Sequence, residues 1–315
     1  SCMNVIVSGS LAYDYVMDFH GRFVDRIMPD KIHNLSLSFL VDRLNKQFGG
    51  TVGNIAYTLK LLGNDPFMVT AAGHDFGEYK KWLTKNRIRT DFIQVLPKVG
   101  TGAYFGVTDL DDNQIGSFYS GASKFNDQLS IFDINEPVGF VIIAPNTPSA
   151  MVRHVRECHK KQLPYLYDPA FQIDNFSTQE LYEGLAQAAI FMGNDYEVAL
   201  IEKKLKITHE KLVGLVPVVV TTRAHQGSII ESGKKKFEIK AATPKNVVDP
   251  TGAGDAYRAG FLTGFLRGFD LTVCGKMGAM AAVYTVEKYG TQTHTFSKKE
   301  FSDRYKENFG TPIQL

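Results

Sequence analysis

A single aspartate follows a stretch of small residues late in the chain. Residues 247–261 read VVDPTGAGDAYRAGF, so Asp255 comes directly after Gly252, Ala253 and Gly254, where a helix is expected to begin. Backbone N–H groups at a helix start can bind an anion. A carboxylate beside them is unsuited to passive phosphate binding, but it could take the proton of a hydroxyl that attacks a bound phosphoryl group. The stretch indicates phosphoryl transfer; a sharp turn into a helix, with Asp255 complementing the helix dipole, is the structural alternative.

A second glycine-rich stretch lies near the N-terminus. In FGGTVGNIA (48–56), Gly49 and Gly50 would let the backbone approach a ligand closely, and Asn54 falls in the first turn of the next helix. The spacing is not the Gly-x-Gly-x-x-Gly of a dinucleotide fold, and no Gly-x-x-x-x-Gly-Lys-Ser/Thr occurs, which argues against an oxidoreductase and a P-loop enzyme. A tight strand-to-helix connection with a capping amide is the alternative.

Two polar segments follow expected strands. Asn194-Asp195-Tyr196-Glu197 comes after IFMGN, where its oxygens could order Mg²⁺ and its waters beside phosphates, or simply cap a helix. TTRAHQG (221–227) follows another strand and could equally be a plain loop. His74 and His225 are interpreted as loop residues without a catalytic role.

Short apolar runs alternate with helical patterns over most of the chain. The runs are NVIVSG (4–9), FMVTAA (67–72), FVIIA (140–144), PYLYD (164–168), IFMGN and VPVVVTT (216–222). Nearly continuous apolar strands separated by helices are typical of a parallel sheet covered on both faces. Ligands of such sheets bind at the carboxyl ends of the strands. We therefore expect one α/β domain spanning residues 1–315.

Two segments, residues 15–48 and 100–121, do not follow this alternation of strands and helices. The second reads as two alternating strands joined by Asp-Leu-Asp-Asp-Asn, and both contain aromatic residues without a crossover helix. We predict that they form a small β-sheet lid. Alternation would point one of Tyr104 and Phe105, and one of Phe118 and Tyr119, towards its inner face. Packing of the lid on the main domain is the alternative role of these aromatics.

Composition excludes several classes of function. The 315 residues carry 35 basic and 33 acidic side chains, and a formal charge of +2 gives no electrostatic footprint for nucleic acid. The three cysteines form no Cys-x-x-Cys, so neither a disulfide framework nor a zinc site is indicated. The apolar stretches are too short to span a membrane. We expect a cytoplasmic protein with a small-molecule substrate and no nucleic-acid or membrane partner.

Together the motifs carry a family resemblance. Gly-Gly-x-x-x-Asn, Asn-x-x-Glu and Asp-x-x-Gly-Ala-Gly-Asp resemble, in order and spacing across essentially the whole chain, the PfkB or ribokinase-like family of carbohydrate kinases. The resemblance implies a three-layer α/β/α fold with a mostly parallel sheet and a small β-sheet lid. It also implies that the γ-phosphate of ATP is transferred to a sugar hydroxyl.

Carried over by position, the resemblance assigns roles to individual residues. Asp255 would be the catalytic base, and Gly252, Ala253 and Gly254 the anion hole. Asn194 and Glu197 would serve the Mg²⁺–phosphate region, without a direct metal ligand being assigned. Pro250 and Thr251 occupy positions that vary among relatives, which leaves dependence on a monovalent cation open. The remaining assignments are Thr222, Arg223 and Gly227 near ATP, and Ser10, Asp14, Gly49, Gly50 and Asn54 at the acceptor.

Within the family, three stretches look most like bacterial adenosine kinases. These are GSLAYD (9–14), NLSLSFLVDRLNKQFGGTVGNIAY and TDLDDNQI. A nucleoside needs an apolar slot for its base, which Tyr104 and Tyr119 could line. The leading prediction is an ATP- and Mg²⁺-dependent adenosine kinase that makes AMP for purine salvage and acts as a monomer beneath its own lid. The alternatives are a kinase of ribose or another furanose, and a non-catalytic nucleoside-binding protein.

Overall fold

The larger sheet of the protein is mostly parallel. The computed structural model describes residues 4–111 and 113–315. Its nine-stranded sheet has the order β13-β12-β11-β10-β9-β8-β1-β4-β5, and only the β12–β13 hairpin at one edge runs antiparallel to its neighbours. The strands are β1 (Asn4–Ser8), β4 (Asp65–Gly73), β5 (Ile93–Leu96), β8 (Phe140–Ile143), β9 (Tyr165–Tyr167), β10 (Ile190–Asn194), β11 (Val218–Thr222), β12 (Ser228–Ser232) and β13 (Lys235–Ile239).

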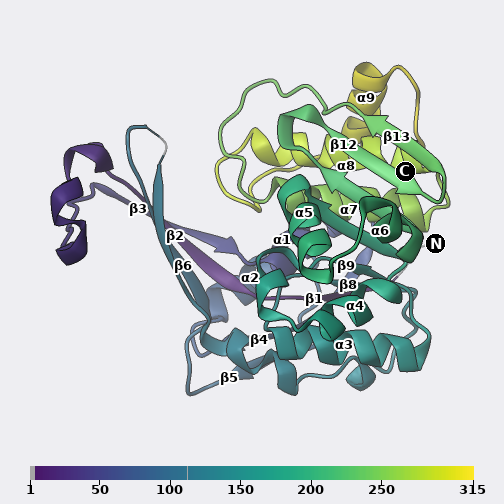
Figure 1. Ribbon diagram of the computed structural model, residues 1–315, viewed down its shortest axis with the longest axis horizontal. Coiled ribbons are helices and arrows are strands. Elements are labelled where there is room, and N and C mark those ends of the chain that lie inside the picture. The colour runs from purple at the N-terminus through teal and green to yellow at the C-terminus, as the bar shows by residue number, and fades with distance from the viewer. Residues whose placement is uncertain (1–3, 112) are drawn as a thin grey trace.

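Helices cover both faces of this sheet, as the continuous apolar strands predict (Figure 1). Side chains that alternate along β1 enter two different cores: Val5 and Val7 belong to one buried cluster and Ile6 to the other. The helices of the first face are α1 (Thr51–Leu61), α2 (Gly77–Lys85), α7 (Ala253–Leu266), α8 (Leu271–Val286) and α9 (Lys298–Phe309). Those of the second are α3 (Pro148–Lys161), α4 (Thr178–Ala186), α5 (Asp195–Leu205) and α6 (His209–Leu215).

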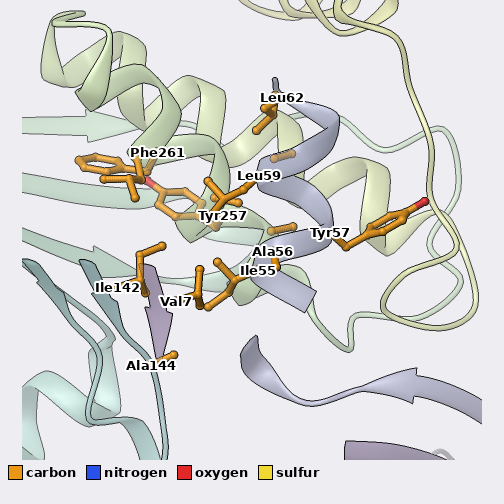
Figure 2. Packing of buried hydrophobic residues seen from close by; sticks show 14 of the residues in the cluster. Val7, Ile55, Ala56, Tyr57, Leu59, Leu62, Ile142, Ala144, Tyr257 and Phe261 are labelled. Atoms are coloured by element: carbon orange, nitrogen blue, oxygen red, sulfur yellow. The ribbon is translucent and has the colours of Figure 1, made fainter. Parts of the chain in front are cut away.

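The core of the first face fixes α1 and α7 against the sheet. Figure 2 shows Val7 and Ile142 of the sheet facing Ile55 of α1 and Tyr257 and Phe261 of α7. Burying a side chain of this size stabilises the fold by about 1.5–3 kcal/mol. The two helices that carry Asn54 and Asp255 are therefore held rigidly relative to each other.

A second sheet of four strands forms the predicted lid. Its order is β3-β2-β6-β7, with β2 (Ala12–Asp18), β3 (Arg43–Gly49), β6 (Gly102–Thr108) and β7 (Gln114–Tyr119). Figure 1 shows this sheet projecting from the main body. The turn between β6 and β7 is built on Asp109, whose carboxylate accepts hydrogen bonds from the backbone of Asp111 and Asn113; Asp112 of the predicted turn lies outside the described residues.

The segment at the far end of the lid differs from the expectation in one respect. Residues 15–48 show little helical pattern, yet the chain between β2 and β3 contains two short 3₁₀ helices, η1 (Phe23–Asp25) and η2 (Pro29–Asn34). A 3₁₀ turn needs only i to i+3 hydrogen bonds over a few residues, so it leaves no amphipathic period in the sequence.

None of the helices that the structure describes is long and apolar enough to cross a membrane.

Candidate active site

The site begins where α7 starts. Gly252 caps this helix with φ +79°, a left-handed conformation that glycine adopts without strain, and a Cβ there would lie 2.8 Å from Thr291 Cγ2. The backbone N–H of Ala253 donates to Pro250 O at 3.2 Å. Those of Gly252 and Gly254 donate no hydrogen bond to any residue that the structure describes. The turn thus presents unpaired donors at a helix N-terminus, next to the carboxylate of Asp255.

Asp255 is held by an amide from the other glycine motif. Asn54 lies on α1, and its Nδ2 donates a 2.9 Å hydrogen bond to Asp255 Oδ2. Asn54 Oδ1 in turn accepts a 3.1 Å hydrogen bond from Gln292 Nε2. The fold therefore brings the two predicted motifs into direct contact.

Gln292 is itself oriented by two aromatic residues of α2. The indole Nε1 of Trp82, which can only donate, bonds Gln292 Oε1 at 3.0 Å. This fixes Nε2 as the end of the amide that donates to Asn54 and, at 2.6 Å, to the hydroxyl of Tyr79. The Tyr79 hydroxyl in turn donates a hydrogen bond to Gly49 O at 2.8 Å. We call Trp82, Gln292, Asn54 and Asp255 the amide relay. Trp82 and Gln292 were not found from the sequence, because nothing local marks either residue.

The protonation of Asp255 is set by opposing effects. Burial raises the pKa of its carboxyl above the ordinary value, and the guanidinium of Arg258 and the hydrogen bond from Asn54 offset only part of that rise. A general base must be ionised to accept a proton, and the two lowering contacts favour the ionised form. The surroundings of Asp255 thus suit proton acceptance from a bound hydroxyl.

The predicted acceptor residues converge at the base of the lid. Gly50 has φ +80°, and a Cβ there would lie 2.5 Å from Ser10 O, so the chain passes close to the end of β1. Gly49 lies directly against the carboxylate of Asp14 on β2. Burial, together with the nearby charges of Asp255 and Asp249, raises the pKa of Asp14 to about 7.

Strand pairing decides which lid aromatics share a face with Asp14. Asp14 lies opposite Tyr104, and Tyr104 lies opposite Phe118, so these three side chains project from one face. Tyr119 lies opposite Ala103 and projects from the other face. Tyr104 and Tyr119, which the sequence analysis predicts together at the acceptor, therefore lie on opposite faces of the lid sheet, and Phe118 shares the face of Tyr104. Because neighbouring strand residues alternate, the partner of Tyr104 depends on the register between β6 and β7.

The predicted nucleotide residues lie at the carboxyl ends of adjacent strands. Asn194, at the end of β10, pairs with Thr222, at the end of β11. Asn194 and Glu197 form a reciprocal capping box at the start of α5, with both hydrogen bonds at 2.8 Å. Arg223 and Gly227 are joined by a backbone hydrogen bond of 2.8 Å in the following turn. The helix-capping alternative for Asn194 is thus observed, and each carboxylate and amide oxygen keeps further lone pairs for a ligand.

A buried ion pair beside these groups was not predicted. Arg258 of α7 contacts Asp168, directly after β9, with Nε 2.5 Å from Oδ2. Asp168 is the last residue of the predicted strand PYLYD. Its position at the carboxyl end of a strand, where ligands bind, could have identified it as a candidate site residue. His74 and His225 are both exposed; His74 lies in a turn, as expected, whereas His225 lies in a one-turn 3₁₀ helix, η6 (Ala224–Gln226). Within residues 4–111 and 113–315, no group of three or more His, Cys, Asp or Glu side chains could hold a metal ion alone.

The chain is similar to known kinases over nearly its whole length. Residues 10–298 match the sequence model of the pfkB family of carbohydrate kinases. A nucleoside kinase from Methanothermobacter thermautotrophicus is 31% identical over 98% of this chain and 97% of its own length. The nucleoside kinase of Burkholderia thailandensis, solved in complex with inosine, superposes with a TM-score of 0.90 at 30% identity, covering 99% of this chain and all of that one. The nucleoside kinase of Methanocaldococcus jannaschii gives a TM-score of 0.86 at 26% identity, over 96% and 98% of the two chains.

Proposed function

This chain belongs to the PfkB family of carbohydrate kinases, and we propose that it is a nucleoside kinase that phosphorylates the 5′-hydroxyl of adenosine. The observation that carries the proposal is the contact between Asn54 and Asp255, which sets a partly buried carboxylate beside unpaired helix-start donors. The similarity to nucleoside kinases over nearly the full chain supports a nucleoside rather than a free sugar as acceptor. The inosine bound to the Burkholderia relative makes inosine the first competitor to test against adenosine.

In the proposed reaction, the acceptor hydroxyl lies between Asp255 and the start of α7. Its oxygen forms a bond to the γ-phosphorus of ATP while the bond to the departing ADP oxygen breaks, and its proton passes to Asp255. The N–H groups of Gly252 and Gly254 stabilise charge on the transferring phosphoryl group. A positioned base of this kind contributes about 10²–10⁴-fold to the rate.

The acceptor would be held from the base of the lid. An ionised Asp14 can accept hydrogen bonds from ribose hydroxyls, and the backbone of Ser10 and Gly49 borders the same place. Tyr104 lies over Gly106 and Gly116, whose missing side chains leave room for its ring. Phe118 projects from the same face and is 52% exposed, so an apolar surface is available to a purine base.

The nucleotide site fits a magnesium ion as an implied cofactor. The carboxylates of Asp168, Glu197 and Asp255 all act on one cation, Arg258, which leaves an excess of negative charge. Oδ1 of Asp168 is buried and has no hydrogen-bond partner among the described residues. Asn194 and Glu197 would hold Mg²⁺ through its waters, and the ion would neutralise charge on the phosphates of ATP. Thr222, Arg223 and Gly227 would border the nucleotide.

One assay tests the acceptor. ADP release is measured with fixed ATP and Mg²⁺ over adenosine, inosine, guanosine, cytidine, ribose and fructose 6-phosphate. The proposal predicts that adenosine has the highest kcat/KM and that ribose is phosphorylated at least tenfold less efficiently. If inosine or cytidine wins, the nucleoside kinase proposal stands but adenosine is the wrong acceptor. If ribose or the sugar phosphate wins, the chain is a sugar kinase, and if nothing is phosphorylated, a nucleoside-binding protein replaces both.

Two further expectations are part of the proposal. A cytoplasmic location follows from cysteine usage, and a monomer from a lid that covers its own site. The lid end carries exposed apolar side chains, with Ile32 65% and Leu40 88% exposed, so light scattering coupled to size exclusion is the appropriate test. A stable dimer would overturn the expectation of a monomer.

A further inference from the structure

The cation beside the catalytic base is buried and tightly held. The Arg258 side chain is 12% exposed, and that of its partner Asp168 is 1% exposed. A buried ion pair is often no more stabilising than apolar residues of the same volume, because both charges lose their hydration. Fold stability alone therefore does not explain why an arginine stands one helical turn after Asp255.

The guanidinium of Arg258 lies against the predicted anion hole. A Cβ on Gly254 would lie only 2.7 Å from Arg258 Nη1. Side chains on a helix lean towards its N-terminus, so Arg258 reaches back along the first turn of α7. Nη1 of Arg258 therefore lies beside Gly254, whose N–H faces the phosphoryl group in the proposed reaction.

The hydrogen-bonding capacity of Arg258 exceeds what Asp168 uses. The guanidinium carries five N–H donors in a fixed plane, and the ion pair engages its Nε side. Three carboxylates, those of Asp168, Glu197 and Asp255, act on this one cation. The remaining donors suit the oxygens of a phosphoryl group, which guanidinium groups bind in a bidentate manner.

We propose that Arg258 is a catalytic residue that binds the phosphoryl group during transfer, and that Asp168 positions its side chain. This inference rests on the proposed kinase function. Arg258 donates hydrogen bonds to the equatorial oxygens while the acceptor O–P bond forms and the bond to ADP breaks. It neither gains nor loses a proton, because the acceptor proton goes to Asp255. Its charge offsets the negative charge that spreads over those oxygens.

The variants Arg258→Met and Arg258→Lys test this role. Methionine keeps much of the length and suits a buried position, whereas lysine keeps the charge but not the planar fork. We expect kcat to fall about 10²–10³-fold in Arg258→Met, by less in Arg258→Lys, with the KM for nucleoside changed less than threefold. A kcat within threefold of wild type in Arg258→Met would overturn the proposal.

A binding measurement separates catalysis from structure. The affinities for Mg-ADP alone and for Mg-ADP with aluminium fluoride, a mimic of the transferring phosphoryl group, are measured by calorimetry. Wild type should bind the fluoride complex at least tenfold more tightly than Mg-ADP. Arg258→Met should keep the affinity for Mg-ADP but lose this difference. An unchanged difference in Arg258→Met would contradict phosphoryl binding by Arg258.

The same measurement distinguishes failure of this inference from failure of the proposed function. It needs no acceptor, so a wild-type protein that phosphorylates no nucleoside can still be compared with its variant.

Asp168→Asn provides the second test if Arg258→Met does not fold. This substitution leaves Arg258 in place but removes the charge that holds its side chain. It should weaken binding of the fluoride complex and leave binding of Mg-ADP unchanged. Wild-type discrimination in Asp168→Asn would overturn its positioning role.

The chain offers a matched control in a second buried ion pair. Arg304 Nη2 lies 2.5 Å from Glu287 Oε1, and the two side chains are 11% and 10% exposed. Arg304→Met removes a cation of similar burial on α9. It should lower the melting temperature and leave both kcat and fluoride-complex binding at wild-type values. Equal catalytic losses in Arg304→Met and Arg258→Met would show that both act through stability alone.

Discussion

Asn54 and Asp255, which are 201 positions apart, meet through a hydrogen bond of 2.9 Å. One belongs to the glycine motif near the N-terminus and the other to the late motif, so the contact joins the two helix starts that border the site. Since the Nδ2 of Asn54 donates, the bond favours the ionised form of Asp255. Through the amide relay, Trp82 also influences the ionisation of Asp255, although its indole contacts Gln292 and not Asp255.

The amide relay predicts an effect of Trp82→Phe on catalysis. The substitution keeps an aromatic ring stacked near Phe48 but removes the N–H that fixes the Gln292 amide. Asn54 is then held less firmly against Asp255, and the pKa of Asp255 rises. A base works only when ionised, so activity is lost as pH falls through this pKa, and the acid limb of the kcat profile should move to higher pH. We expect kcat at pH 7 to fall about threefold to tenfold.

Tyr165→Phe is the control for this prediction. It also removes one buried hydrogen bond, from the Tyr165 hydroxyl to Gly184 O at 2.7 Å, but on the other face of the sheet. The control should lose stability without shifting the pH profile. A profile of Trp82→Phe that overlays that of wild type would show that the relay does not reach Asp255.

The sequence allowed the fold and the two glycine motifs to be predicted because their signals are local. Strands such as FVIIA are buried on both faces, so each is an unbroken apolar run. The relay has no such signal, because Trp82 and Gln292 lie far from Asp255 in the sequence and meet it only in the folded chain. Arg258 stood inside the late motif, but a helical arginine usually faces solvent. Its burial became apparent only with Asp168 beside it.

The raised pKa of Asp14 predicts a stability change with pH. Its pKa of about 7 in the folded protein lies above the ordinary value of 3.8, so folding favours the protonated carboxyl. The free energy of unfolding should therefore decrease as pH rises from about 4 to about 7 and then level off. Asp14→Asn removes this loss, because asparagine does not titrate. Its melting temperature should exceed that of wild type by more at pH 8 than at pH 5, while its KM for adenosine rises at least tenfold.

Melting curves of both proteins at pH 5, 6, 7 and 8 provide the measurement. The same difference in melting temperature at every pH would show that Asp14 titrates normally in the folded protein. An unchanged KM for adenosine would remove Asp14 from the acceptor site.

The register of the lid predicts which aromatic residues determine specificity. Tyr104 and Phe118 share a face with Asp14, and Tyr119 does not. Tyr104→Ala and Phe118→Ala should each lower kcat/KM for adenosine about tenfold to a hundredfold, since a base–aromatic contact contributes on the order of 1–3 kcal/mol. Their effect on ribose should be smaller, because ribose has no base.

Tyr119→Ala is the matched control on the opposite face. It should leave the ratio of kcat/KM for adenosine and ribose within threefold of wild type. If Tyr119→Ala lowers kcat/KM for adenosine more than Phe118→Ala does, the base is bound on the other face of the lid sheet. Sequence alternation identifies the two strands, but only the pairing of Tyr104 with Phe118 identifies the face.

The most direct test of the central claim compares wild type with Asp255→Asn in a single-turnover reaction with ATP, Mg²⁺ and adenosine. Asparagine keeps the size of the side chain but cannot accept the proton. Chromatography of the products should show AMP and ADP in equal amounts from wild type, and AMP formation about 10²–10⁴-fold slower from the variant. Circular dichroism should show the same folded content, and the affinity for adenosine should be retained. AMP formed by Asp255→Asn at the wild-type rate would contradict the assignment of Asp255 as the base of a nucleoside kinase.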